Sequence, residues 1–435
     1  MKQKKLTPAI AFCLVCIIGM TSVAGCFCLL GTDHWSGFFW FNLGEAIPYR
    51  YADTGMDFYH SIEYLKGNNP YEQWHVIYPP LANLMFKVLF HMVPDEQKNA
   101  WTDEFMASVA MRKSENDLRV WMPTAMLFIV FFLLMSLLTY SIIVNYDGRR
   151  FRGVMAFSAM FSYGYLYALE RGNIVILAMT TALLFVLYHD SDVPWVREAA
   201  LLSLAVSANL KLYPAVFGII LLYEKRWKDA IRTVIYGVLL FVLPCLVFKN
   251  GLNNIPMFLN NVKGFADGVG TSNLGTSLDR LLYSILELSG RVFNFPMPYE
   301  FYTRVAVHVD RICLVVCLFC GLVLPKKWQK CLCCTLGIIL LSNQGIYGTV
   351  FITLPAVMYL HEEETFSRRN IVPFVGILLT LAILPVFNKW ESAFSRTSLR
   401  LQVGLGILLL YVIVATVCTL KARHWKLFAP SQAER

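Results

Sequence analysis

Residues 122–144 read MPTAMLFIVFFLLMSLLTYSIIV, a stretch without a single charged side chain. An α-helix of about 20 apolar residues is long enough to cross the ~30 Å hydrocarbon layer of a bilayer. Residues 11–30 and 399–420 have a similar length and almost no charge. Over the whole chain 57% of residues are hydrophobic and 15% are charged, whereas about a quarter are charged in soluble domains. The composition therefore predicts an all-α polytopic membrane protein.

Clusters of Lys and Arg orient the predicted spans, because these residues concentrate on the cytoplasmic side of membrane proteins. The clusters are Lys2–Lys5, Arg149–Arg152, Lys225–Arg232, Lys326–Lys330 and Lys421–Lys426. All of them fall on one side if the chain crosses the membrane twelve times. The predicted spans are 9–30, 119–144, 153–169, 173–188, 197–210, 213–223, 231–248, 304–324, 331–342, 346–360, 371–387 and 399–420. This topology places both termini in the cytoplasm, and we expect the protein to lie in the plasma (cell) membrane.

Two pairs of short segments, 197–223 and 331–360, leave an alternative open. Each pair can form a re-entrant hairpin instead of two spans, and removing either pair leaves the other orientations unchanged. Residues 78–93 are also apolar, but counting them as a span would turn Arg149–Arg152 outward. We place this segment as a helix lying on the outer surface.

The topology predicts one membrane domain, residues 1–435, with two large outer loops. The first, residues 31–118, contains twelve Asp or Glu and six Lys or Arg, and the second covers residues 249–303. The net charge of +9 does not indicate nucleic-acid binding, since the basic residues are scattered at the ends of apolar runs. The bilayer is the predicted partner instead.

The candidate chemistry lies on the predicted outer face. A partly desolvated carboxylate can serve as a general base toward a hydroxyl, and the first outer loop offers Asp53 and Asp57, of which the resemblance described below favours Asp57, with Asp53 in reserve. Three cations, Arg171, Lys211 and Arg280, map to the same face and together suit a lipid-linked phosphate. The plainer alternatives are that the acids are solvated and that Lys211 snorkels to the interface.

Several short motifs occur in a characteristic order. They are Asp57-Phe58 followed by Glu63, Gly67-x-x-Pro70-Tyr71, Tyr78-Pro79-Pro80-Leu81, Arg171-Gly172-Asn173, Ala208-x-x-Lys211-Leu212-Tyr213-Pro214-Ala215 and Asn273-x-x-x-Ser277-Leu278-x-Arg280. In this order they resemble glycosyltransferase family 87, membrane mannosyl- and arabinosyltransferase-like enzymes of the GT-C class that use polyprenyl-phosphate sugars. The resemblance covers roughly residues 40–360 and implies a GT-C-like helical bundle.

The chain departs from the family in one late outer loop. Where the family often shows Ser-Pro-x-Ser-Trp-x-His-His, this sequence reads SNQGIYGT at residues 342–349. Gly348 and Thr349 stand in place of the two histidines. If those histidines assist the base or bind the donor phosphate, this protein uses other groups, prefers a different sugar, or has lost activity.

The resemblance implies the transfer of a sugar from a polyprenyl monophosphate to the hydroxyl of a glycan, glycolipid or other acceptor, with inversion of the anomeric configuration. The expected sugar is a mannose-like hexose or a pentose. Asp57 is the expected base, and Arg171, Lys211 and Arg280 are expected to bind the donor phosphate. We expect no metal and no cofactor. The residues expected to bind substrate are Asn173, Tyr213, Asn273, Ser277, Tyr59, Tyr71 and Tyr78.

Two other classes of function stay open at this stage. A transporter or flippase usually has inverted repeats and ionisable groups near the membrane midplane, whereas the polar residues here gather on one side. A non-catalytic family member, acting as a scaffold, is the other alternative, because the two histidines are missing.

Overall fold

The computed structural model describes residues 7–22, 55–66, 69–99, 121–146, 148, 152–268, 276, 278, 282, 285, 289–290, 299–341, 346–383 and 399–424. Every regular element in these residues is a helix, which confirms the predicted all-α class. A first helix covers Pro8–Ser22. The others are α3 (Met56–Glu63), α4 (Pro70–Gln73), α5 (Pro80–His91), α7 (Met122–Tyr146), α8 (Arg152–Met160), α9 (Tyr163–Arg171), α10 (Val175–Tyr188), α11 (Pro194–Leu210), η1 (Tyr213–Gly218), α12 (Ile219–Tyr223), α13 (Trp227–Cys245), η2 (Gly251–Asn253), α14 (Asn254–Gly268), α16 (Tyr299–Val323), α17 (Lys327–Ile339), η4 (Ile346–Ile352), α18 (Thr353–Glu362), α19 (Ile371–Leu381) and α20 (Leu399–Ala422).

Helical structure occurs at each of the twelve segments predicted as spans, but the number of spans is not confirmed. Among the described residues, two helices are long and apolar enough to cross a membrane, Met122–Tyr146 and Arg400–Ala422. Shorter apolar helices, such as α10 and α19, need neighbouring segments to reach across a bilayer. The remaining spans stay predictions.

The prediction of one continuous helix over residues 153–169 is wrong. The chain breaks between α8 and α9 at Ser162, whose backbone is extended (φ −93°, ψ 158°). The break lets α9 pack directly on η4. A Cβ atom built on Gly164 would lie 2.7 Å from the backbone nitrogen of Val350, so only a glycine permits this approach. Tertiary packing therefore overrides the apolar pattern here.

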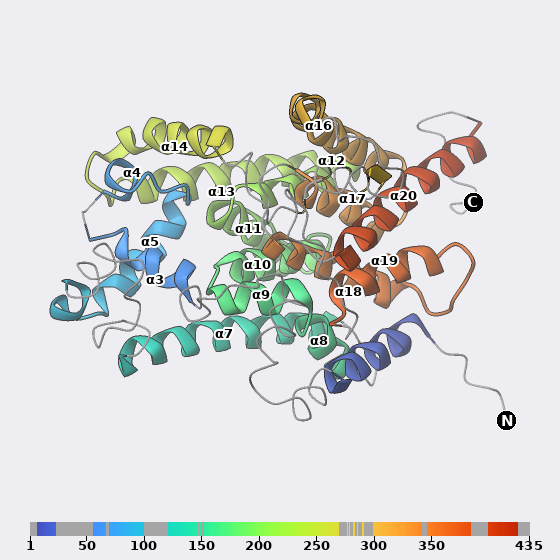
Figure 1. Cartoon of the computed structure of the whole chain (residues 1–435), viewed down its shortest axis with the longest axis horizontal. Coiled ribbons are helices and arrows are strands. Elements are labelled where there is room, and N and C mark those ends of the chain that lie inside the picture. Colours follow the sequence, from blue (N-terminus) through green and yellow to red (C-terminus); the bar gives the residue numbers. More distant parts are fainter. Residues whose placement is uncertain are drawn as a thin grey trace.

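The shorter helices form the interior of the molecule. α17 is buried from Trp328 to Ile339 with the exception of Lys330, and α18 is buried from Thr353 to Leu360. Figure 1 shows α10 and α18 in the middle, with α7 along one side and α14 along the opposite side. α7 and α13 carry exposed apolar side chains, such as Leu133 and Val234. These exposed faces suit contact with lipid tails.

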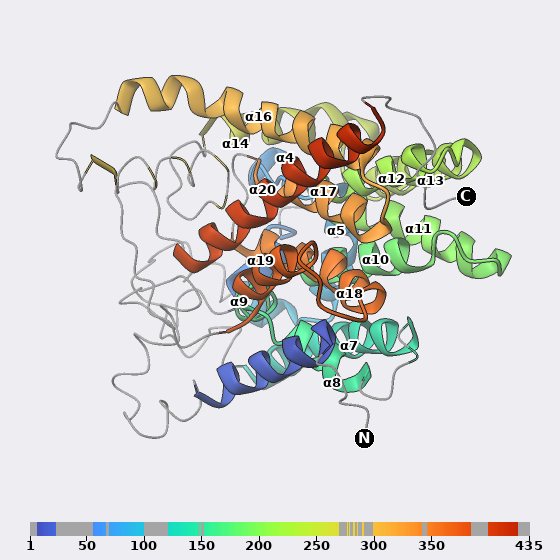
Figure 2. The same ribbon diagram turned by 90° about the vertical axis from the view of Figure 1, so that its right-hand side faces the viewer.

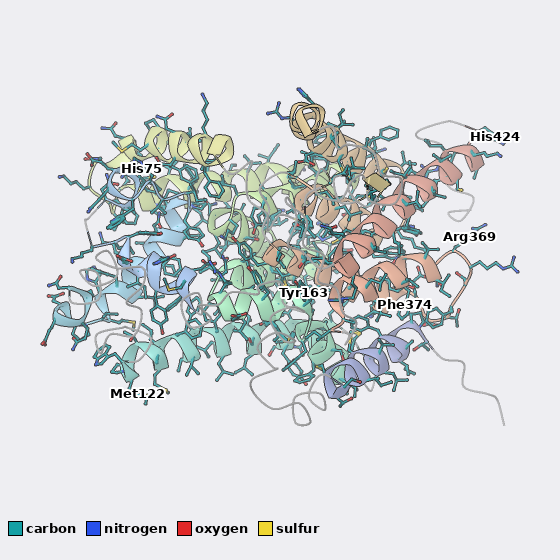
Figure 3. The ribbon with its side chains drawn as sticks, viewed as in Figure 1. His75, Met122, Tyr163, Arg369, Phe374 and His424 are labelled. Atoms are coloured by element: carbon teal, nitrogen blue, oxygen red, sulfur yellow. The ribbon has the colours of Figure 1, made fainter. Side chains whose placement is uncertain are left out.

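Four helices from the predicted outer segments, α3, α4, α5 and α14, lie together at one end of the long axis in Figure 1. Figure 3 labels His75 and Met122 at that end, and Arg369 and His424, which are predicted to lie inside, at the opposite end. The helix α16, which begins in the second predicted outer loop, lies apart from these four helices. The orientation in a bilayer stays a prediction.

The two predicted outer loops contact each other. α5 forms within the segment predicted as a surface helix, residues 78–93, and packs on α3, α11 and α13. From the second loop, the Asn261 side chain donates hydrogen bonds to the carbonyls of Tyr71 (2.9 Å) and Val76 (3.3 Å). These bonds fix α14 against α4 and the segment that follows it.

Two glycines bring α19 and α20 into close contact, and Figure 2 shows these helices side by side. A Cβ on Gly404 would lie 2.8 Å from Cγ2 of Thr380 and 3.1 Å from the carbonyl oxygen of Gly376. Because lipid tails are as apolar as leucine, helices in membranes associate through such close van der Waals packing of small residues.

We expect Gly404→Ala to lower the stability of the folded protein by about 1–3 kcal/mol, as overpacking does elsewhere. Thermal unfolding in detergent should show a lower Tm. The matched control is Gly237→Ala, because a Cβ at that position on α13 meets nothing within 4 Å. Equal Tm values for the two variants would contradict the packing argument.

Candidate active site

A glycine turn ends α9 next to α3. Gly172 adopts the left-handed conformation (φ 66°) and its N–H donates to the carbonyl of Leu169. The N–H of Asn173 donates to the carbonyl of Ala168 (2.9 Å). Glycine is favoured in this conformation because it has no Cβ to clash with its own backbone. The chain then reverses into α10.

A second glycine lies directly against this turn. Gly55 precedes α3, is also left-handed (φ 72°), and donates its N–H to the carbonyl of Glu170 at 2.7 Å. A Cβ on Gly172 would lie 2.9 Å from Cβ of Phe58 and 3.2 Å from Cα of Gly55. The first turn of α3 is therefore held on the end of α9, and Figure 1 shows the two helices close together.

This contact places the predicted base beside two predicted site residues. Arg171 Nη2 donates to Oδ1 of Asp57 at 3.1 Å, and Asn173 Nδ2 donates to Oδ2 at 2.6 Å. The side chains of Arg171 and Asp57 are 20% and 18% exposed, so both remain within reach of a substrate. A carboxylate has about four lone-pair sites, so capacity remains on both oxygens for a further proton donor.

Asn173 is held on both sides of its amide. Its Oδ1 accepts the backbone N–H of Val175 at 2.9 Å, while its Nδ2 binds Asp57. The residue is buried. In this structure it orients the carboxylate, and its predicted contact with substrate stays untested.

Lys211 reaches the same site from α11. Its ammonium lies 4.2 Å from the ring centroid of Tyr78 and 5.9 Å from that of Tyr347, which indicates cation–π contacts. Burial lowers the pKa of Lys211 to about 8, and the negative charge of Asp57 opposes this shift. Among the described residues no carboxylate forms an ion pair with Lys211. The side chain is thus a partly desolvated cation available to an anion.

The sequence of this chain matches a known family of enzymes. The family model of glycosyltransferase family 87 matches residues 77–342. The chain belongs to glycosyltransferase family 87. It is therefore a glycosyltransferase, and its apolar helices agree with a membrane protein. Searches of curated proteins and of solved structures gave no match.

The family 87 match includes most of the described site. Tyr78, Arg171, Asn173 and Lys211 lie inside the matched residues, and Asp57 lies before them. Family membership supports the transferase over the transporter.

The predicted tyrosines divide into two groups. Tyr59 and Tyr71 are buried, with their hydroxyls donating to the backbone carbonyls of Thr124 (3.3 Å) and Tyr78 (3.1 Å). Tyr78 and Tyr213 are partly exposed. The described geometry therefore gives Tyr59 and Tyr71 a structural role in this family 87 enzyme, whereas Tyr78 faces the site.

Four predicted site residues lie outside the described part of the chain. They are Asp53, Asn273, Ser277 and Arg280. The segment 342–345, which begins the stretch that lacks the family's histidines, also lies outside it. Their roles stay predictions. Within the described residues no three His, Cys, Asp or Glu side chains are grouped to hold a metal ion, and the expectation of a metal-free enzyme stays untested.

Sequence reasoning missed Tyr347 as a site residue. Its ring stacks on Tyr167, with centroids 5.9 Å apart and an interplanar angle of 19°, and it faces Lys211 on another side. The available signal was its position, directly before Gly348 and Thr349, in the stretch that departs from the family. An aromatic ring there gives Lys211 a second contact.

Replacing Gly172 should destabilise the protein and displace Asp57. Gly172→Ala adds a left-handed alanine, costing about 1–2 kcal/mol, and also a clash with Phe58. Gly251→Ala is the matched control, because Gly251 is left-handed too (φ 53°) but its Cβ would meet nothing within 4 Å. In thermal unfolding, Gly172→Ala should lower the Tm more than Gly251→Ala does. A similar decrease in Tm in both variants would show that the contact between Gly172 and α3 contributes nothing to stability.

Proposed function

We propose that this enzyme transfers a sugar from a polyprenyl monophosphate to an acceptor hydroxyl on the outer face of the plasma membrane. The observation that carries the proposal is Asp57, fixed by Arg171 and Asn173 and close enough to Lys211 to influence its ionisation. A base and cations at one partly exposed place suit this reaction. The proposed sugar is a mannose-like hexose or a pentose. The proposed acceptor is a glycan, a glycolipid or another alcohol.

Asp57 is proposed as the general base. It removes the proton of the acceptor hydroxyl while the acceptor oxygen attacks the anomeric carbon of the donor. The bond from that carbon to the phosphate oxygen breaks, and the electron pair leaves with the phosphate. Attack opposite the leaving group inverts the configuration of the sugar. The bonds to Arg171 and Asn173 fix the carboxylate in one orientation, which lowers the cost of reaching the reactive geometry.

The cations are proposed to stabilise the departing phosphate. Lys211 is well suited, since it is partly desolvated and has no carboxylate partner among the described residues. A positive charge in such a place interacts more strongly with developing negative charge than it would in water. Arg171 is assigned to the same phosphate site because its guanidinium carries a positive charge and lies beside Asp57. Arg280, outside the described residues, remains part of the proposed phosphate site.

The proposed cations stabilise the departing phosphate, and a monophosphate carrier lacks the diphosphate that commonly recruits a divalent ion, so this proposal includes no metal ion and no other cofactor. The proposed partners are the lipid-linked donor, the acceptor and the bilayer. The acidic outer loop and the basic inner clusters support an active site outside and termini in the cytoplasm.

Asp57→Asn should lower transfer by about 10²–10⁴-fold, as expected for loss of a general base. The protein in liposomes is offered a panel of polyprenyl-phosphate hexoses and pentoses, and release of carrier phosphate is measured. Asp95→Asn is the control, because Asp95 lies in the same outer loop but is 90% exposed. A folded Asp57→Asn variant with full activity would exclude this base, and no release from any donor would favour a transporter or scaffold.

The charge on Lys211 predicts a dependence on pH. Because its pKa is lowered to about 8, the ammonium is lost as the pH rises through that value. We expect kcat/KM for the donor to fall above pH about 8, since this parameter reports the free enzyme. In Lys211→Arg the guanidinium stays protonated, so the decline should move to much higher pH. A decline at the same pH in the arginine variant would assign it to another group.

A further inference from the structure

The exposed side of α3 is narrow and carries a defined set of residues. Along α3 and its C-cap, Asp57, His60 and Tyr64 are partly exposed, and the other residues from Met56 to Glu63 are buried. Positions i, i+3 and i+7 lie on one face of a helix. Seven residues at 1.5 Å each give this face a length of about 10 Å. It begins at the proposed base.

Aromatic rings cover this face beyond Asp57. The rings of His60 and Tyr64 stack, with centroids 5.9 Å apart and an interplanar angle of 29°. The ring of Trp74, directly after α4, lies 5.6 Å from that of Tyr64. We call Asp57, His60, Tyr64 and Trp74 the α3 strip. Burial raises the pKa of Tyr64, and Glu63 and Asp57 add to that shift, so this ring lies within electrostatic reach of the base.

Polar groups beside the strip lack partners among the described residues. Trp74 is only partly exposed, and its Nε1 is buried without a hydrogen-bond acceptor. Both carboxyl oxygens of Glu63 are buried without a donor, and the residue is 2% exposed. Burial raises the pKa of Glu63 to about 7, so at neutral pH the carboxyl is protonated in much of the population and can donate. Unpaired buried polar groups cost free energy.

The geometry points to the α3 strip as the subsite for the acceptor, with a sugar ring of the acceptor stacked on Tyr64 and Trp74 and its reacting hydroxyl directed to Asp57. This inference rests on the proposed function. A sugar offers an apolar C–H face to the partly exposed rings of Tyr64 and Trp74 and a hydroxyl to Asp57. The donor phosphate is assigned to Lys211, on a different helix, so donor and acceptor approach Asp57 from separate elements.

Aromatic residues also anchor proteins at the membrane interface, but this role explains the α3 strip less well than sugar binding does. Trp195 and Trp227, at the opposite, predicted inner side, are 74% and 60% exposed, as expected for rings in a headgroup layer. The ring of Trp74 instead packs against the ring of Tyr64, and its Nε1 atom is buried. It has the surroundings of a binding site.

The test measures binding of soluble sugars without any donor. The full-length protein, in a detergent without a sugar headgroup, is mixed with methyl glycosides of mannose, glucose, galactose and arabinose. Saturation-transfer NMR reports which glycoside contacts the protein. For Trp74→Leu and Tyr64→Leu we expect the signal of the bound glycoside to fall by about three- to tenfold, the usual effect of one aromatic contact.

Two control variants make the result specific. Trp74→Phe keeps a ring and should retain most of the signal, and Trp195→Leu removes an exposed tryptophan from the opposite side and should leave the signal unchanged. If no glycoside binds the wild type, or if folded Trp74→Leu and Tyr64→Leu bind like the wild type, the subsite is excluded. Equal losses in Trp195→Leu would exclude it as well. Glycoside binding by a protein that releases no carrier phosphate from any donor would overturn the proposed function and leave the strip as a sugar site.

Discussion

The hydrogen bond from the N–H of Gly55 to the carbonyl of Glu170 is the contact on which the site depends. It joins the start of α3 to the end of α9, two segments far apart in the sequence. The approach is possible because Gly55 and Gly172 both lack a side chain where their backbones meet. From this one contact follow the positions of Asp57 on one segment and of Arg171 and Asn173 on the other. A long-range backbone contact thus sets the relative positions of these three side chains.

The electrostatics of the site follow from partial desolvation. One carboxylate, Asp57, pairs with Arg171, while Lys211 is close enough to feel its charge and is contacted by two tyrosine rings. Water cannot screen these charges fully, so the cations attract an anion more strongly than they would in bulk water. In this family 87 enzyme the aromatic rings of Tyr78 and Tyr347 contact the lysine.

The apolar pattern predicted where helices form, because helical segments must satisfy their backbone groups wherever lipid surrounds them. It failed at residues 153–169, since the reason for the break is the approach of Gly164 to η4, a partner far along the chain. The motifs predicted Asp57, Arg171 and Lys211 as one site. They could not separate Tyr59 and Tyr71, which are packed inside, from Tyr78, which faces the site, because burial depends on neighbours from other helices.

The sequence by itself determined the helical class, the positions of most helices, the family and the main charged residues of the site. These properties depend on composition and on short motifs, which are local along the chain. The tertiary structure alone decided that Asn173 holds Asp57, that Tyr347 faces Lys211, and that Asp57, His60 and Tyr64 share the exposed side of α3. Each of these depends on which distant segments pack together, and the apolar pattern of one segment does not specify its partner.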